Sequence, residues 1–296
     1  MQVCNFDSVP RLEQPVVFLL GVFDGVHLGH QYLFSRARAI SEAKKIPMAA
    51  LTFSFSPRSL KAAGKKWQVL TNKGQKRELL SGLGLSTLIE LFLSPEIQNM
   101  EPLDFLKCLD LKLNIDTWVV GSDVGFGKGR SGDKTLLEQY VGERGKQAVF
   151  IEKKCVDGKP ISSTRIHQAL FFGDFHTASQ LLGRAYRFRA ECLDIAKDST
   201  GEIVRLDTFP PLSPNDGGWN VMITGVNCPA ILYTREGVCC LKVRAGVVSS
   251  GQVVEIEPIE AVPTEQSHGV ELKLSPSVSA SSKRERVMIY KEKEYV

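Results

Sequence analysis

The sequence predicts a doubly wound, Rossmann-like α/β domain followed by a smaller, all-β, barrel-like domain. From residue 16 to about residue 152, apolar runs of strand length alternate with amphipathic stretches of helix length. This is the pattern of βα units around a parallel sheet. After Tyr186 the helical spacing ends, and short apolar segments are separated by Gly, Pro and Asn-Asp clusters. We therefore assign residues 1–186 to the first domain and residues 187–296 to the second.

Apolar spacing predicts each element of the first domain in turn. The expected strands are residues 16–20, 48–53, 87–91, 117–120 and 148–151. The expected helices are residues 29–44, 75–83, 102–111, 134–144, 163–172 and 175–182. In the second domain, strands are expected at residues 219–224, 230–233, 238–243 and 253–256, with 287–290 as a candidate further strand. The serine-rich residues 275–286 predict a mobile loop.

The composition is that of a folded protein with a substantial core, since 43% of the 296 residues are hydrophobic. A net charge of +4 is too small to indicate a nucleic-acid or membrane surface. The seven cysteines form no Cys-x-x-Cys pair and have no histidines at metal spacing, so neither a disulfide framework nor a zinc site is indicated. The first residues lack a secretory pattern. We expect a cytoplasmic protein without a nucleic-acid or membrane partner, and its oligomeric state stays open.

A glycine-rich turn, residues 21–30 with the sequence GVFDGVHLGH, joins the first predicted strand to the first predicted helix. Ligands of open α/β sheets bind at this edge, and the free N–H groups of a helix start attract phosphate. His27 and His30 lie three residues apart, which puts their imidazoles on one side, and Gly29 leaves room for a ligand. Two imidazoles can donate hydrogen bonds to phosphate oxygens that gain charge as pyrophosphate leaves. The alternatives are a surface turn, an incidental pair and a metal site, for which no third ligand is apparent.

Two further blocks carry polar or glycine-rich patterns. Ser162, Ser163, Thr164 and Arg165 begin a predicted helix, where hydroxyls can cap the helix and a guanidinium can hold phosphate oxygens. A helix cap with an ordinary surface arginine is the alternative. Residues 119–130 follow a strand and contain four glycines, so a ligand can approach the main chain there, and an aromatic side chain could stack on a ring. A flexible surface loop is the alternative.

These blocks resemble a known family. The turn is similar to the signature of the HxGH nucleotidyltransferase superfamily and, specifically, of the bacterial FAD synthetase family. Residues 161–166 resemble that family's second ATP-phosphate block, and residues 119–127 resemble its flavin and nucleotide loop. Residues 173–186, whose helical spacing alone indicates packing, resemble the segment that joins the two modules of bifunctional riboflavin kinase/FMN adenylyltransferases.

The resemblance implies a role for each matching residue. His27, His30 and Arg165 are the implied catalytic residues. The implied contacts to ATP and its phosphates are Phe23, Asp24, Gly25, Gly29, Ser162, Ser163 and Thr164. The implied flavin or nucleotide contacts are Asp123, Phe126 and Gly127, with Phe126 as the stacking ring. Mg²⁺ is the expected cofactor, without assigned protein ligands.

The sequence also departs from the family's pattern. Ser54 and Ser56 stand where the family has a carboxylate and a histidine, and His167 replaces an arginine of the phosphate block. The Pro-Thr-Ala-Asn motif of riboflavin kinases does not occur. We therefore expect transfer of AMP from ATP to FMN, giving FAD and pyrophosphate, with a degenerate kinase-like domain. The alternatives are a bifunctional enzyme, a non-catalytic flavin or nucleotide binding protein, and a cytidylyltransferase of the same superfamily.

Overall fold

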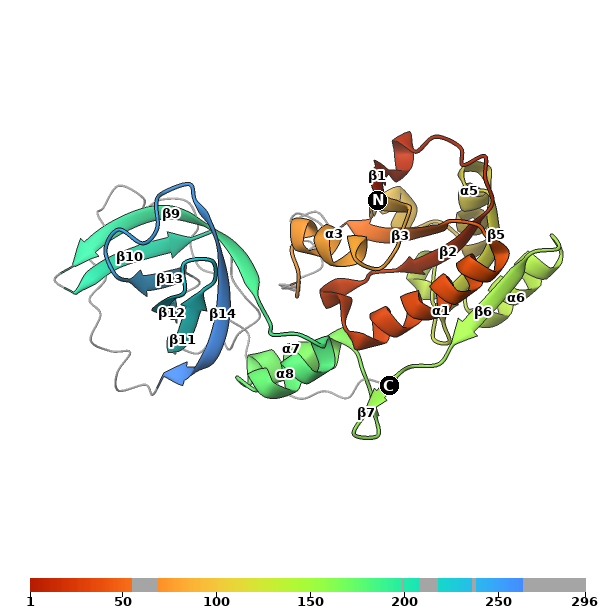
Figure 1. Cartoon of the computed structure of the whole chain (residues 1–296). Coiled ribbons are helices and arrows are strands. Elements are labelled where there is room, and N and C mark those ends of the chain that lie inside the picture. The colour runs from red at the N-terminus through yellow and green to blue at the C-terminus, as the bar shows by residue number, and fades with distance from the viewer. Residues whose placement is uncertain (55–68, 199, 208–217, 236–237, 263–296) are drawn as a thin grey trace.

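The computed structural model describes residues 1–54, 69–198, 200–207, 218–235 and 238–262. It contains an α/β domain and a closed β-barrel, and a pair of helices, α7 (Ser163–Phe171) and α8 (Phe175–Leu182), lies between them (Figure 1). Within these described ranges, no helix has the length and apolar character that crossing a membrane requires. The two-part architecture expected from the sequence is confirmed.

All five strands predicted for the first domain are present, in a six-stranded sheet of order β1-β4-β3-β2-β5-β6 whose pairs are all parallel. The strands are β1 (Gln2–Asn5), β2 (Val16–Gly21), β3 (Met48–Ser54), β4 (Thr87–Phe92), β5 (Ile115–Gly121) and β6 (Gln147–Ile151). The sequence pattern did not predict β1. This strand is short and largely exposed at the sheet edge, so it carries no apolar run.

Helices cover both faces of the sheet because successive residues of a strand point to opposite sides. Val17 and Leu19 of β2 pack with α1 (Leu28–Lys44) and α3 (Lys73–Ser81). Phe18 and Leu20 pack with α5 (Pro102–Lys112) and α6 (Lys134–Gly142) on the other face. The sheet is therefore doubly wound, as predicted, and its strands are buried on both sides. A one-turn helix, α4 (Pro95–Gln98), precedes α5.

The strand order places a topological switch point between β2 and β5. From β2 the chain proceeds to β3 and β4 on one side, and it then returns to β5 and β6 on the other. Ligands of open α/β sheets bind at the carboxyl ends of the strands at such a point. The turn after β2 and the glycine-rich loop after β5 both lie there.

The second domain is a closed antiparallel barrel of order β10-β13-β12-β11-β14-β9. Its strands are β9 (Phe188–Asp198), β10 (Gly201–Leu206), β11 (Gly218–Ile223), β12 (Cys228–Arg235), β13 (Val238–Val243) and β14 (Val253–Val262). The four strands expected between residues 219 and 256 are confirmed, whereas β9 and β10 were not predicted. The predicted loop at residues 275–286 and the candidate strand at 287–290 lie outside the described residues.

The α7–α8 pair shares its hydrophobic core with the barrel. Leu170, Leu181 and Tyr186 belong to the same buried cluster as residues of β9 to β14. Trp219 of β11 packs edge-on to Phe175 of α8, with ring centroids 5.5 Å apart. The boundary that the sequence pattern suggested at residue 186 therefore passes through a continuous core.

Candidate functional site

The turn after β2 holds an unusual backbone conformation. Phe23 and Val26 have φ angles of 51° and 40°, in the left-handed region that non-glycine residues rarely adopt. Gly25 has a φ of 74°, which suits glycine. The short 3-10 helix η2 (Asp24–Val26) fills the turn, and His27 then serves as the N-cap of α1. Strain of this kind persists where surrounding contacts fix the chain, and it is concentrated at functional sites.

The two histidines stack on each other at the start of α1. Their ring centroids are 3.6 Å apart with an interplanar angle of 13°. The backbone N–H of His30 donates to Nδ1 of His27 over 3.3 Å, so the proton of a neutral His27 ring resides on Nε2. Nδ1 of His30 is buried and, among the described residues, has no hydrogen-bond partner. The predicted juxtaposition of the two imidazoles is therefore present.

Burial keeps both rings neutral near pH 7. It lowers the pKa of His27 to about 4, against an opposing effect of the Asp24 carboxylate. Burial also lowers the pKa of His30 well below its usual value, and the neighbouring His27 and Lys76 act in the same direction. Neutral imidazoles retain one N–H donor and one acceptor each. The pair can therefore hydrogen-bond an anionic ligand without itself carrying charge.

Asp24 and Gly25 fix the turn to the segment that precedes α3. The Asp24 carboxylate accepts hydrogen bonds from the backbone N–H groups of Leu70 (3.0 and 3.1 Å) and Thr71 (3.3 Å). The N–H of Gly25 donates to Oγ1 of Thr71 over 3.2 Å. The sequence predicted phosphate contacts for Asp24 and Gly25, whereas in this structure their polar groups are occupied within the protein.

Arg184 holds the turn from the other side. Its Nη2 donates to the carbonyl oxygen of Gly25 over 2.6 Å, and its Nη1 lies 3.4 Å from that of Val26. Gln31 donates to the carbonyl oxygens of Val26 and Leu182 over 2.9 and 3.1 Å. Sequence reasoning missed both side chains, because a donor to main-chain carbonyls far along the chain leaves no local pattern.

The Ser162–Arg165 block lies against the same turn. Ser162 caps α7 by accepting a hydrogen bond from the N–H of Arg165 over 3.2 Å. The hydroxyl of Ser163 donates to the carbonyl oxygen of Asp24 over 3.2 Å, and Thr164 is exposed. The two blocks that the sequence singled out for phosphate therefore meet at the carboxyl edge of the sheet.

Arg165 points elsewhere in this structure. Its Nη1 donates to the carbonyl oxygens of Val156 (3.0 Å) and Lys159 (3.1 Å), which belong to a hairpin of β7 (Cys155–Val156) and β8 (Lys159–Pro160). Its Nη2 is 3.9 Å from the carboxylate of Asp157. The guanidinium thus holds the hairpin, which sequence reasoning had not predicted, and its role towards phosphate stays a prediction.

The loop after β5 departs from its expected role in one respect. Phe126 is 3% exposed and packs against Phe105 of α5, with ring centroids 6.3 Å apart. Such burial leaves the ring no free face for a flavin, so the predicted stacking is not available in this structure. Gly127 has a φ of 71° and lies close to Pro102. A Cβ atom on residue 127 would come within 2.7 Å of the Cα of Pro102. Asp123 is at the surface, 2.7 Å from Nζ of Lys153.

A group of charged residues beside the turn also escaped sequence reasoning. Glu90, within β4, is 4% exposed and accepts hydrogen bonds from Nε and Nη2 of Arg77 over 2.8 and 2.7 Å. Lys73 lies 2.8 Å from the same carboxylate. These ion pairs lower the pKa of Glu90 against the effect of its burial. Lys76, on the same helix, donates to the carbonyl oxygen of Val22 over 3.1 Å.

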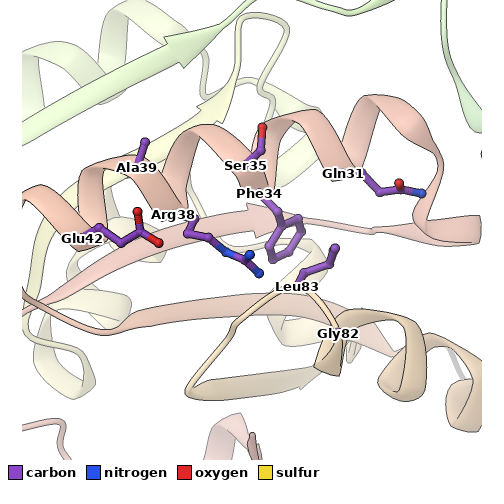
Figure 2. Close-up of a pocket in the computed structure, with 8 residues that line it drawn as sticks. All are labelled: Gln31, Phe34, Ser35, Arg38, Ala39, Glu42, Gly82 and Leu83. Carbon is purple, nitrogen blue, oxygen red and sulfur yellow. The ribbon is translucent and has the colours of Figure 1, made fainter.

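A pocket of about 250 Å³ lies away from the histidines, between α1 and the turn that precedes β4. Figure 2 shows Phe34 and Arg38 reaching from α1 towards Leu83. Neither His27 nor His30 lines it. Over the described part of the chain, no group of three or more His, Cys, Asp or Glu side chains is placed to hold a metal ion.

Comparisons with known proteins agree with the motifs. A family model described as FAD synthetase matches residues 9–165. A bifunctional riboflavin kinase/FMN adenylyltransferase of Listeria monocytogenes is 32% identical over 171 residues, which are 57% of this chain and 54% of the relative. The match thus spans about half the length of that relative. A protein named FAD synthetase from the same species is 30% identical over 188 residues, 63% of this chain and 76% of the relative.

Two further similarities extend into the barrel. The bifunctional riboflavin kinase/FMN adenylyltransferase of Escherichia coli K12 is 26% identical over 262 residues, 86% of this chain and 81% of the relative. A crystal structure described as that of a macrolide-efflux protein from Streptococcus pneumoniae superposes with a TM-score of 0.71 at 22% identity. It covers 88% of this chain and 91% of its own. At that identity the likeness concerns the fold, and it includes both domains.

Proposed function

Because the chain belongs to the FAD synthetase family, we propose that its α/β domain transfers AMP from ATP to FMN, giving FAD and pyrophosphate. The observation that carries the proposal is the stacked pair of neutral imidazoles at the start of α1, at the switch point of the sheet. The relatives named above as FMN adenylyltransferases or FAD synthetase support the choice of FMN as acceptor.

The proposed mechanism needs no covalent intermediate on the protein. The acting groups are the imidazole N–H donors of His27 and His30 and the free N–H groups at the start of α1, which would face the triphosphate. A terminal phosphate oxygen of FMN attacks the α-phosphorus of ATP, and the bond to the β-phosphate oxygen breaks as pyrophosphate leaves. The imidazole donors stabilise oxygens that gain negative charge in that step.

The remaining predicted residues take supporting roles in this proposal. Phe23, Asp24, Gly25 and Gly29 shape the turn, and Ser162, Ser163 and Thr164 are assigned to the phosphate side. Arg165 is assigned to that side as well, although in this structure its guanidinium holds the β7–β8 hairpin. Asp123 and the main chain at Gly127 are assigned to the flavin or nucleotide side. Mg²⁺ is expected to arrive with the ATP phosphates, since it commonly binds substrate phosphates and water with few protein ligands. We propose that the reaction takes place in the cytoplasm.

Replacing His30 with alanine tests this function. We expect His30→Ala to keep the thermal midpoint of unfolding within a few degrees and to lower turnover about a hundredfold, as for the loss of a charge-stabilising donor. FAD formation from ATP and FMN is measured by chromatography, with Tyr32→Ala, an exposed position on the same helix, as the matched control. Near-normal turnover by His30→Ala would remove the role assigned to the pair.

The barrel is proposed not to phosphorylate riboflavin, because the Pro-Thr-Ala-Asn motif is missing from the sequence. Incubating the protein with riboflavin, ATP and Mg²⁺ distinguishes an enzyme that only adenylylates FMN from one that also phosphorylates riboflavin. We expect neither FMN nor FAD without added FMN. Either product would instead assign the chain the double activity that is named for several of its relatives.

A further inference from the structure

Lys76 lies at the edge of the histidine turn, on the first turns of α3. Its Nζ donates to the carbonyl oxygen of Val22, which also accepts from Oγ1 of Thr52 over 2.9 Å. The helix α3 packs against η2, and the charge of Lys76 is close enough to lower the pKa of His30. The ammonium group therefore lies beside the stacked imidazoles.

Lys76 differs from the neighbouring cations of its helix. Lys73 and Arg77 are both paired with the buried carboxylate of Glu90. In the ranges that the structure describes, no carboxylate oxygen lies within 4.0 Å of Nζ of Lys76. Burial lowers the pKa of Lys76, while Asp24 and Glu90 oppose that effect from further away. A partly desolvated cation without a carboxylate partner gains from an anionic ligand.

The other cations near the turn are already engaged. Arg184 directs its donors to the carbonyl oxygens of Gly25, Val26 and Leu182. Arg165 directs Nη1 to the β7–β8 hairpin. An ammonium group has three N–H donors, and the described contacts of Lys76 use one of them. Two donors therefore stay available beside the imidazole pair.

We propose that Lys76 is a phosphate-binding residue of this site, whose ammonium donates to the polyphosphate of a nucleoside triphosphate. The inference rests on the proposed function for the identity of that ligand as ATP. Lys76 supplies the positive charge that the neutral histidines lack. It thereby complements the hydrogen bonds from the imidazoles and from the start of α1.

The experiment compares Lys76→Met with Lys73→Met in the full chain. Lys73 lies on the same helix and is exposed, and it contacts Glu90 rather than the turn. Binding of MgATP, inorganic pyrophosphate and adenosine is measured by calorimetry, and FAD formation from ATP and FMN is measured at varied ATP. Lys76→Arg, which retains the charge, serves as the conservative variant.

We expect Lys76→Met to weaken the binding of MgATP and pyrophosphate about 10- to 100-fold, the loss typical of a charged hydrogen bond. Adenosine, which lacks phosphate, should bind equally to the wild type and to all variants. Lys73→Met should stay within about twofold of the wild type for every ligand, and Lys76→Arg should recover most of the lost affinity. A loss of adenosine binding as well would indicate damage to the fold and would contradict a phosphate-specific role.

The outcomes separate this inference from the proposed function. If the wild type binds MgATP and pyrophosphate but forms no FAD, the proposed reaction fails, and the binding comparison still decides the role of Lys76. Unchanged pyrophosphate binding by Lys76→Met would overturn the inference even in an active enzyme. So would equal losses in Lys76→Met and Lys73→Met, or a wild type that binds neither phosphate ligand.

Discussion

The turn after β2 and the loop after β5 have the same position in the fold but use their residues differently. Both are glycine-rich, both follow a central strand, and they flank the switch point. In the turn, the buried His30 ring keeps an unpartnered nitrogen among the described residues. In the loop, the Phe126 ring is buried against Phe105 and has no face open to a ligand. Glycines beside a sheet edge can therefore serve either the approach of a ligand or the close packing of the protein itself.

The largest expected effect is on stability and concerns Phe126 in the loop after β5. Phe126→Ala should lower the free energy of unfolding by about 3–5 kcal/mol, because it empties a buried aromatic site. Urea titration followed by fluorescence measures the change. Val124→Ala, in the same loop and only partly buried, is the milder control. A loss below about 1 kcal/mol, together with weakened FMN binding, would instead return Phe126 to the flavin role that the sequence predicted.

The next effect concerns the turn and depends on pH. The folded-state pKa of His27 is about 4, below the value of 6.5 expected in the unfolded chain. The unfolded state therefore takes up the proton first as the pH falls. The free energy of unfolding should drop from pH 6.5 to pH 4 by up to about 3 kcal/mol and level off below that.

Urea titrations at pH 7, 5.5 and 4.5 check this pH dependence against His27→Gln. The glutamine variant should lose the contribution of His27, so its stability should fall less over the same interval. Parallel curves for the two proteins would show that His27 is solvated and easily protonated in the folded state. The burial that keeps the imidazole pair neutral would then be absent.

A smaller effect is expected from loosening the turn. Arg184→Met removes the donors to Gly25 and Val26, so it should lower kcat/KM for ATP about tenfold and stability by about 1–3 kcal/mol. Arg184→Lys keeps the charge without the planar fork and should recover only part of the loss. Initial rates and thermal melts report both quantities. Full activity in Arg184→Met would show that the turn keeps its conformation without this contact.

The sequence predicted those parts of the molecule that a local pattern encodes. The buried strands and amphipathic helices of the first domain, the histidine turn and the all-β character of the second domain were all expected, because periodic burial marks them. The edge strand β1 and the barrel strands β9 and β10 were missed. In β10, buried and partly buried residues do not alternate cleanly, so its period is obscured.

The contacts that complete the site could not be predicted in the same way. Arg184 reaches Gly25 across 159 positions of the chain, and Lys76 reaches Val22 across 54. Such contacts depend on how α3 and α8 pack against the turn, which no local spacing records. The predicted stacking of Phe126 is not available in this structure for a related reason, since an aromatic residue in a glycine-rich loop fits a ligand or a core equally well until the packing is known.

The continuous core beneath α7 and α8 has a consequence for dividing this chain into parts. A fragment ending at residue 186 would expose Leu170, Leu181 and Tyr186, which the barrel now covers. A fragment ending before Ile161 would instead lose Ser163 and Arg184, which hold the histidine turn. Neither half can therefore be separated without exposing part of this core or losing contacts of the site. A chimaera that exchanges the barrel between relatives has to transfer α7 and α8 together with the barrel residues that they contact.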